Sequence, residues 1–195
     1  MFPSTSMPDR NWWAALWPRP EEALRAIGIT PQMTVLDLCC GDGYFTAPLA
    51  RLVQGKVIAL DIDCAILEQA KSEVARQGAT VRQWLCADAM ALDEHVAESV
   101  DYVLMANTFH GVPDQPGLAR AVHSVVRAQG LFTIVNWYPS RREDTPVLGE
   151  PRGPRAKMRM SPQAVASVVE RVGFRVSRIV ELPPYHYGAV FEALR

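Results

Sequence analysis

A nearly continuous apolar run that leads into a glycine-containing loop is the feature that most restricts the fold of this chain. The run covers residues 33–40, and Gly41, Asp42 and Gly43 follow it before a helical pattern that reaches Val53. Apolar runs of this kind are typical of a strand that is covered on both faces of a parallel sheet. Glycines directly after such a strand let the backbone pass close to a ligand before the next helix begins. The pattern predicts an α/β protein with a ligand crevice at this strand end.

The rest of the chain alternates short apolar runs with segments of helical periodicity, which favours an α/β sheet protein. Helices are predicted after Pro20, from Cys64 to Gln77, over 118–126 with Gly130 at the end, and from Ser161 to Gly173. Seven strands with interleaved helices result. The six strands after the first are expected at 57–61, 81–86, 101–107, 131–137, 174–182 and 187–194.

Two segments depart from this alternation within what we expect to be one domain, residues 1–195. The first, residues 1–30, is a Trp- and Pro-rich segment with a helix, and its three tryptophans either cap the sheet edge or form a lid over an active site. The second, residues 138–160, is expected to be a long loop in which six basic residues face three acids. It is either a solvated surface or a segment that closes over a substrate. Residues 183–188 form a rigid turn that either lines a pocket or closes a hairpin.

Composition narrows the class of protein. A net charge of −1 gives no general attraction to nucleic acid or to an anionic membrane. No apolar run is long enough to cross a membrane, and the first ten residues lack the pattern of a signal peptide. We therefore expect a cytoplasmic protein without membrane insertion, and the oligomeric state stays open.

The cysteines and histidines show no metal-ligand spacing, so no metal site is predicted. The four cysteines lie among apolar neighbours, which favours reduced, buried thiols. They are Cys39, Cys40, Cys64 and Cys86.

The glycine loop does not fit a dinucleotide. The dinucleotide fingerprint requires a third glycine or alanine, and this chain has Thr46 at that position. Asp37 and Asp42 would also repel a pyrophosphate, whereas they suit a ligand that is cationic or rich in hydrogen-bond donors. Taken alone, the glycines are equally consistent with a plain strand-to-helix turn.

The stretch D-L-C-C-G-D-G, residues 37–43, resembles motif I of class I S-adenosylmethionine-dependent methyltransferases. The Cys39-Cys40 doublet is similar to that of the quinone-biosynthesis methyltransferases, although many family members have glycine at the position of Cys39. The resemblance extends from about Thr34 to Trp137. It implies a Rossmann-like, seven-stranded, mostly parallel sheet with helices on both faces and an antiparallel closing strand, and S-adenosyl-L-methionine as the cofactor.

The resemblance also implies which residues bind the cofactor. Asp61 matches the acid that binds the ribose hydroxyls, the Asp88-Ala89 pair matches the adenine contact, and Asn107 would lie beside the sulfonium. The alternative interpretation of Asp61 is an acid that stabilises a helix N-terminus, and that of Asp88 is a residue that caps a loop. The full predicted set is Asp37, Cys39, Gly41, Gly43, Asp61, Ile62, Asp88, Ala89 and Asn107.

The acceptor of the methyl group is less well indicated. We expect it to be approached by residues 107–110, by residues 138–160 and by the Trp-rich N-terminal segment. His110 is either a general base or a loop histidine bonded to the backbone, while His95 and His123 are expected on the surface. Compact size favours a small-molecule acceptor. One alternative is an RNA or protein methyltransferase, which the basic loop would favour. The other is a cofactor-binding module without turnover.

Overall fold

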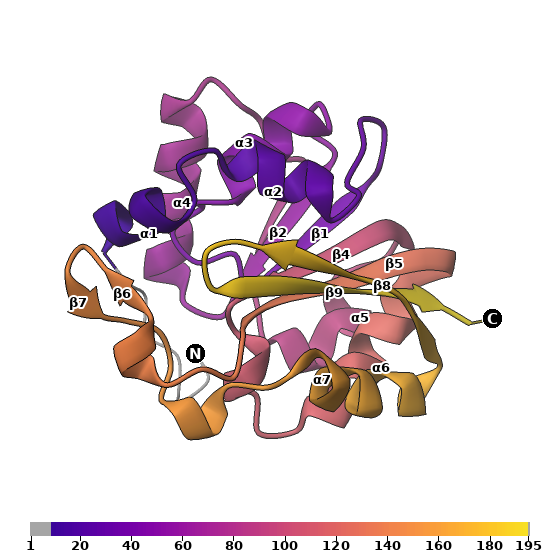
Figure 1. The fold of residues 1–195 in the computed structure, drawn as a ribbon. Helices are drawn as coiled ribbons and strands as arrows, with labels where there is room; N and C mark the ends of the chain where they lie inside the picture. The colour runs from indigo at the N-terminus through magenta and orange to yellow at the C-terminus, as the bar shows by residue number, and fades with distance from the viewer. Residues whose placement is uncertain (1–8, 195) are drawn as a thin grey trace.

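A seven-stranded sheet forms the centre of the computed structural model, which describes residues 9–194 (Figure 1). The strand order is β3-β2-β1-β4-β5-β9-β8. The first five strands run parallel, whereas β9 is antiparallel to both of its neighbours. The predicted seven-stranded, mostly parallel sheet with an antiparallel closing strand is therefore confirmed. The strands are β1 (Val35–Leu38), β2 (Val57–Asp61), β3 (Gln83–Cys86), β4 (Val100–Ala106), β5 (Val126–Trp137), β8 (Phe174–Leu182) and β9 (His186–Ala193).

Helices cover both faces of this sheet, and each face has its own apolar core. Successive side chains of β1 point to opposite faces, so Val35 packs with one core and Leu36 and Leu38 pack with the other. On the first face lie α1 (Arg10–Leu16), α2 (Pro20–Ala26) and α3 (Thr46–Leu52), with α4 (Cys64–Arg76) against α3. On the second face lie α5 (Leu92–His95), α6 (Gln115–Val125) and α7 (Pro162–Val169).

Side-chain caps define where several of these helices begin. Asp63 caps α4, where its carboxylate accepts hydrogen bonds from the amides of Ala65 and Ile66. Ser161 caps α7, and Pro162 occupies the first helical position, as the sequence predicts. The helices that follow β2 and precede β8 therefore begin at positions that local chemistry sets.

The boundary between α6 and β5 differs from the sequence prediction, which placed Gly130 at the end of the helix. The helix ends at Val125, and β5 begins at once with Val126, which pairs with Val100 of β4. Gly130 lies inside the strand, and the neighbouring Gln129 has a φ of 60°. Pairing with β4, which contains a register shift, thus takes precedence over the local preference of glycine for a helix end.

Residues 138–160, here called the basic segment, are more structured than the predicted loop. The segment contains a short hairpin of β6 (Pro146–Val147) and β7 (Glu150–Pro151). The buried Arg159 holds it together, because its guanidinium donates to the carbonyl oxygens of Arg152 and Pro154 and lies over the ring of Trp137. Two-residue strands and prolines leave no periodic pattern, which explains why the sequence indicated only a loop.

The prediction of four reduced thiols is wrong for one pair. Cys64 and Cys86 form a disulfide with their Cα atoms 5.3 Å apart, while Cys39 and Cys40 are free. Cys86 pairs in register with Asp61 at the end of β2, and Cys64 begins the helix that follows β2. Parallel strand pairing therefore brings together two cysteines whose spacing in the sequence gives no signal.

Two further sequence expectations concern membranes and leader segments. Between residues 9 and 194, no helix combines the length and apolar character needed to cross a membrane. The signal-peptide analysis depends on residues 1–8, which lie outside the described residues.

Candidate functional site

The glycine loop after β1 turns sharply at the carboxyl end of the sheet. Cys39, Gly41 and Gly43 have φ values of 60°, 57° and 81°, all in the left-handed region. A side chain at Gly43 would bring a Cβ atom within 2.9 Å of the Cα atom of Ala70 in α4. Close packing on α4 therefore requires a glycine at position 43, whether or not a ligand approaches it. At this position the interpretation as a plain strand-to-helix turn is sufficient.

Two carboxylates are held in fixed orientations next to this loop. The Oδ2 atom of Asp61 accepts a hydrogen bond from the amide of Gly41 at 2.9 Å, and its Oδ1 atom accepts one from the amide of Asp63 at 3.0 Å. Because Asp63 is the cap of α4, Asp61 is not needed as its N-terminal acid. The Oδ2 atom of Asp37 accepts a hydrogen bond from the hydroxyl of Thr46 at 2.6 Å. Thr46, which stands where a dinucleotide fingerprint has its third glycine, thus orients the Asp37 carboxylate by a hydrogen bond.

Two other acids differ in how freely they face the crevice. Asp42 forms an ion pair with Arg10 at 3.4 Å. Less of its negative charge is therefore available to a ligand than the sequence alone suggested. Asp88 accepts a hydrogen bond from the amide of Met90 at 2.9 Å, which is the loop-capping role. One oxygen of Asp88 is used in this bond. The capping role and a ligand contact are therefore compatible.

Burial and mutual repulsion make the loop region favourable for a cation. Burial raises the pKa of Asp37 to about 6, the hydrogen bond from Thr46 opposes this, and the charge of Asp61 adds to it. Burial also raises the pKa of the Cys39 thiol, and the charges of Asp61, Asp37 and Asp88 raise it further. Three carboxylates therefore act on one short loop, and a positive charge placed there would be stabilised.

The raised pKa of Asp37 predicts a pH dependence of stability. Between about pH 4 and pH 6 the folded protein holds a proton on Asp37 that the unfolded chain has lost, so the free energy of unfolding should decrease as pH rises through this range. The decrease should be about 3 kcal/mol and should end above pH 6. Asp37→Asn removes this group, and all other ionisable residues stay. Urea unfolding at several pH values should show the wild type losing stability relative to the variant, and parallel curves would contradict the assignment.

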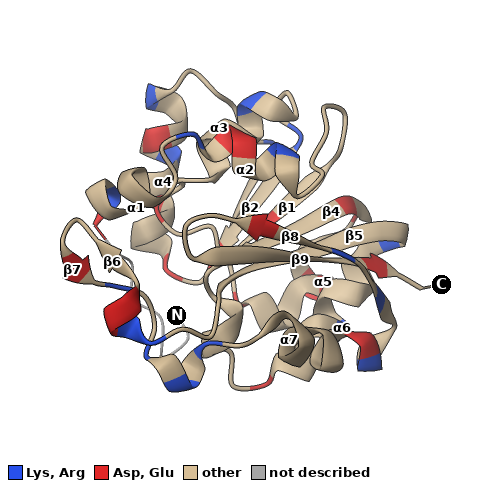
Figure 2. Cartoon of the chain, in the orientation of Figure 1, with Lys and Arg blue, Asp and Glu red and all other residues tan. Residues whose placement is uncertain are grey.

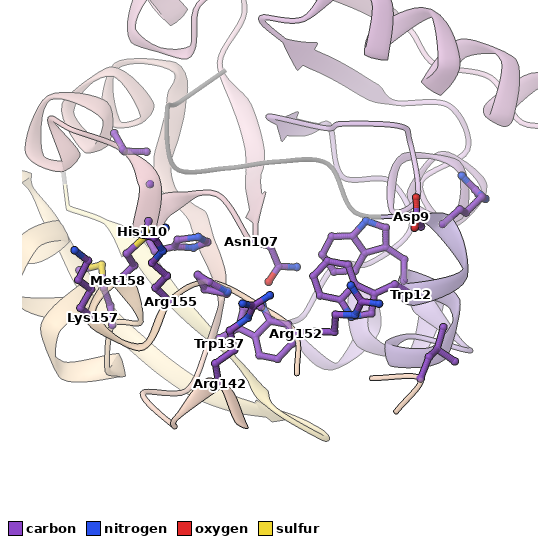
Figure 3. A pocket seen from close by; sticks show the side chains of 18 of the residues that line it. Asp9, Trp12, Asn107, His110, Trp137, Arg142, Arg152, Arg155, Lys157 and Met158 are labelled. Carbon is purple, nitrogen blue, oxygen red and sulfur yellow. The ribbon is translucent and has the colours of Figure 1, made fainter. Parts of the chain in front are cut away.

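A large cavity lies next to Asn107 and His110 (Figure 3). Its volume is 1560 Å³, and its wall combines α1, the residues that follow β4, the end of β5 and the basic segment. The three elements that the sequence assigned to the acceptor side are thus brought together. Figure 2 shows Lys and Arg of the basic segment next to β6 and β7. The residues that line the cavity include Trp12, Trp13, Asn107, His110, Trp137, Arg142, Arg152, Arg155 and Lys157.

Asn107 belongs both to the predicted cofactor set and to the wall of this cavity. Its φ is 58°, and its amide donates to the carbonyl of Val135 at 2.8 Å. Its side-chain Oδ1 and Nδ2 atoms are buried and have no hydrogen-bond partner among residues 9–194. Buried polar atoms without partners are costly, so this amide is suited to a ligand that would satisfy it.

His110 lines the same cavity and contacts a side chain from β5. Its Nδ1 atom lies 3.5 Å from the Oδ1 atom of Asn136, so its side-chain contact is not with the backbone. Burial lowers the pKa of His110, while the contact with Asn136 raises it and the charge of Arg159 lowers it. The imidazole is consequently neutral at pH 7 and able to accept a proton.

The turn from 183 to 188 closes the β8–β9 hairpin and packs behind the cavity wall. The ring of His186 lies 4.8 Å from that of Trp17 and 4.2 Å from that of Trp137, and burial lowers its pKa to about 3. The Tyr187 hydroxyl donates to the carbonyl of Met160. Trp137 and Met160 also line the cavity, and the sequence indicated Trp137 only as the end of a strand.

The tryptophans of α1 combine both interpretations that the sequence left open. Trp13 and Trp17 are buried in the core of the first face, as expected for a cap on the sheet. Trp12 and Trp13 also line the cavity. Of the surface histidines, His95 is exposed, whereas His123 is half-buried and its ring contacts Phe174.

Sequence comparison matches the part of the chain that contains the glycine loop. Residues 35–130 match the family described as methyltransferase domain. The demethylmenaquinone methyltransferase of Lactococcus lactis subsp. lactis (strain IL1403) is 30% identical over 116 residues, which are 58% of this chain and 46% of that protein. The chain thus spans about half the length of the curated relatives it matches.

Structural comparison extends the similarity to nearly the whole chain. A SAM-dependent methyltransferase from Aquifex aeolicus has a TM-score of 0.77 at 24% identity, with 95% of this chain and 94% of that chain covered. The N-methyltransferase NodS from Bradyrhizobium japonicum WM9, in complex with S-adenosyl-L-homocysteine, has a TM-score of 0.68 at 14% identity, with 91% and 87% covered. At these identities the two structures show that the fold is shared.

Proposed function

With residues 35–130 identified as a methyltransferase domain of the Rossmann-like class, we propose that the chain transfers the methyl group of S-adenosyl-L-methionine to a small-molecule acceptor. The observation that supports this best is the Asp61 carboxylate, which two backbone amides hold at the end of β2 beside the glycine loop. This oriented acid lies where ligands of open α/β sheets bind.

The nucleoside part of the cofactor would be held at the ends of β2 and β3. Asp61 would accept hydrogen bonds from the two ribose hydroxyls, and charge-assisted bonds of this kind are strong. Ile62 and Met90 are large apolar residues that are 44% and 36% exposed, and they follow Asp61 and Ala89 in the chain. A bound adenine would cover such apolar surface, while Asp88 and Ala89 would contact its edge.

The charged end of the cofactor would lie over the glycine loop. Its amino group and sulfonium are cationic, which fits the acidic surroundings of Asp37, Cys39, Gly41 and Gly43 described above. The unpartnered amide of Asn107 would lie beside the sulfonium. When bound, the cofactor supplies an activated methyl group, and the main task of the protein is to align it with the acceptor.

His110 would act on the acceptor. The cavity wall that contains Asn107 also contains His110, so an acceptor in this cavity has access to both. A neutral imidazole can take the proton that a hydroxyl or amine loses when it attacks the methyl group. Asn136, which contacts the Nδ1 atom, would hold the ring so that the Nε2 atom receives this proton.

Calorimetric titration tests the cofactor assignment. S-adenosyl-L-homocysteine and S-adenosyl-L-methionine should bind the purified chain, and NAD should not. The reason is that the acids at the loop attract a cationic ligand and repel a pyrophosphate. Binding of NAD without any response to S-adenosyl-L-homocysteine would refute the proposal.

A screen with methyl-labelled cofactor separates the remaining alternatives. Label transferred to a metabolite pool supports the small-molecule acceptor, and label transferred only to RNA or protein points to a macromolecular acceptor. Cofactor binding without transfer in any of these pools would favour a module that lacks turnover.

A further inference from the structure

We infer that the acceptor is an aromatic molecule that bears an anionic group, either a carboxylate or a phosphate. The inference rests on the proposed function and names the class of molecule that the 1560 Å³ cavity is built to take. The side chains of the cavity wall support it.

One side of the cavity is a wall of indole rings. The rings of Trp12 and Trp13 are stacked with centroids 5.3 Å apart, and the ring of Trp137 lies 6.2 Å from that of Trp12. Aromatic rings pack well on such surfaces in offset or edge-to-face arrangements. The Nε1 atoms of Trp12 and Trp13 are buried without hydrogen-bond partners in the described part of the chain. These N–H groups would donate to oxygen atoms of a ligand.

The other side of the cavity is cationic. Arg142, Arg152, Arg155 and Lys157 line it, and Asp9 is the acidic residue in the wall. Across residues 9–194, none of these four cations has an ion-pair partner, whereas Arg141 of the same segment is paired with Asp144. Four unpaired cations around one space repel one another, and an anion bound among them would relieve this repulsion.

Arg152 connects the two sides. Arg152 lines the cavity together with Trp12 and Trp137. In the view of Figure 3, Arg155 is drawn on the side of His110. The Nε atom of Arg152 is buried and has no hydrogen-bond partner among the described residues. A guanidinium binds carboxylate and phosphate oxygens through two parallel hydrogen bonds. An aromatic ring against the tryptophans would place its anionic group at Arg152 and leave a hydroxyl within reach of His110.

Two ligands that differ only in charge test this inference. The probes are 3-hydroxy-2-naphthoate and its neutral amide, 3-hydroxy-2-naphthamide, titrated by calorimetry into protein saturated with S-adenosyl-L-homocysteine. The naphthoate should bind at least about tenfold more tightly than the amide, because hydrogen bonds to a charged group contribute more than neutral ones. 3-Hydroxycyclohexanecarboxylate, which has the charge without the aromatic ring, should bind more weakly than the naphthoate.

Variants assign the preference to the cationic side. Replacing Arg152 and Arg155 with Ala should weaken naphthoate binding by about 10- to 100-fold, weaken amide binding much less, and leave cofactor affinity unchanged. Arg141→Ala is the matched control, because it removes a positive charge from the same segment outside the cavity wall. Equal binding of naphthoate and amide, or naphthoate binding that the double variant does not change, would overturn the inference.

The same titrations keep this inference separate from the proposed function. Titration of the naphthoate is repeated without cofactor, and titration of S-adenosyl-L-homocysteine is done on its own. Naphthoate binding that depends on the arginines, without binding of S-adenosyl-L-homocysteine, would refute the methyltransferase proposal and support the anion site. Binding of S-adenosyl-L-homocysteine without any preference for the naphthoate would support the methyltransferase proposal and refute the anion site.

Discussion

Replacing Asp61 with Ala should weaken the binding of S-adenosyl-L-homocysteine by about 10- to 100-fold, because hydrogen bonds to a charged group contribute roughly 1.5–3 kcal/mol. In the proposed complex, the substitution leaves both ribose hydroxyls without their charged acceptor. The two amides that now donate to Asp61, those of Gly41 and Asp63, lose a partner as well, so the loop would also be less well ordered for the ligand. Calorimetric titration of wild type and variant measures the difference.

Two further variants separate ligand binding from support of the loop. Asp61→Asn keeps an oxygen that can accept from the amide of Gly41 and removes the charge, so it should weaken binding less than Ala does. Asp63→Ala removes the cap of α4 and should lower thermal stability, yet it should leave cofactor affinity within about twofold of wild type. Wild-type affinity in Asp61→Ala would remove this residue from the cofactor site.

Replacing His110 with Ala should lower kcat, measured with an acceptor found in the labelling screen, by about 100- to 10,000-fold, the usual contribution of a general base. Affinity for S-adenosyl-L-homocysteine should be unchanged, since His110 lines the cavity that we propose for the acceptor. The wild-type kcat should decline on the acid side below pH 6.5, because burial lowers the pKa of His110 and protonation removes the base. This acid limb should be absent from the residual activity of the variant.

The neighbouring residue gives a sharper measurement of the same role. Asn136→Ala removes the contact that raises the pKa of His110, so the acid limb should move to lower pH while His110 itself stays in place. His95→Ala is the control, because it changes an exposed histidine at the end of α5 and should have no effect on the profile. If kcat and its pH dependence survive in His110→Ala, the residue is only part of the cavity wall.

The positions of the parallel strands could be read from the sequence because burial on both faces leaves apolar runs. The predicted strand at 57–61 agrees with β2 to the residue. The strand predicted at 174–182 agrees equally well with β8, although β8 is an antiparallel edge strand with several exposed residues. Asp61, Asp88 and Asn107 could likewise be placed, since each lies at or just after the end of a strand and parallel strands end on one side of the sheet. Local chemistry also indicated the start of α7, where Ser161 and Pro162 act within one turn of the helix.

Other features depend on residues that are distant in the sequence. The β6–β7 hairpin is held by Arg159, whose partners include Trp137 at the end of β5. The Cys64–Cys86 disulfide follows from the register of β2 and β3. Neither contact has a periodic signal, because each joins side chains that only the packed sheet brings into reach.

The glycine loop and the large cavity of this protein were therefore determined at different levels. The sequence alone determined the parallel strands, the glycine loop and the acids beside it, because each strand and the turn after it contain their own local pattern. Tertiary structure alone decided that Trp12, Asn107, Trp137 and Arg152 surround one cavity. These four side chains come from α1, the loop after β4, the end of β5 and the basic segment, and their contact depends on how the helices and the hairpin pack against the sheet.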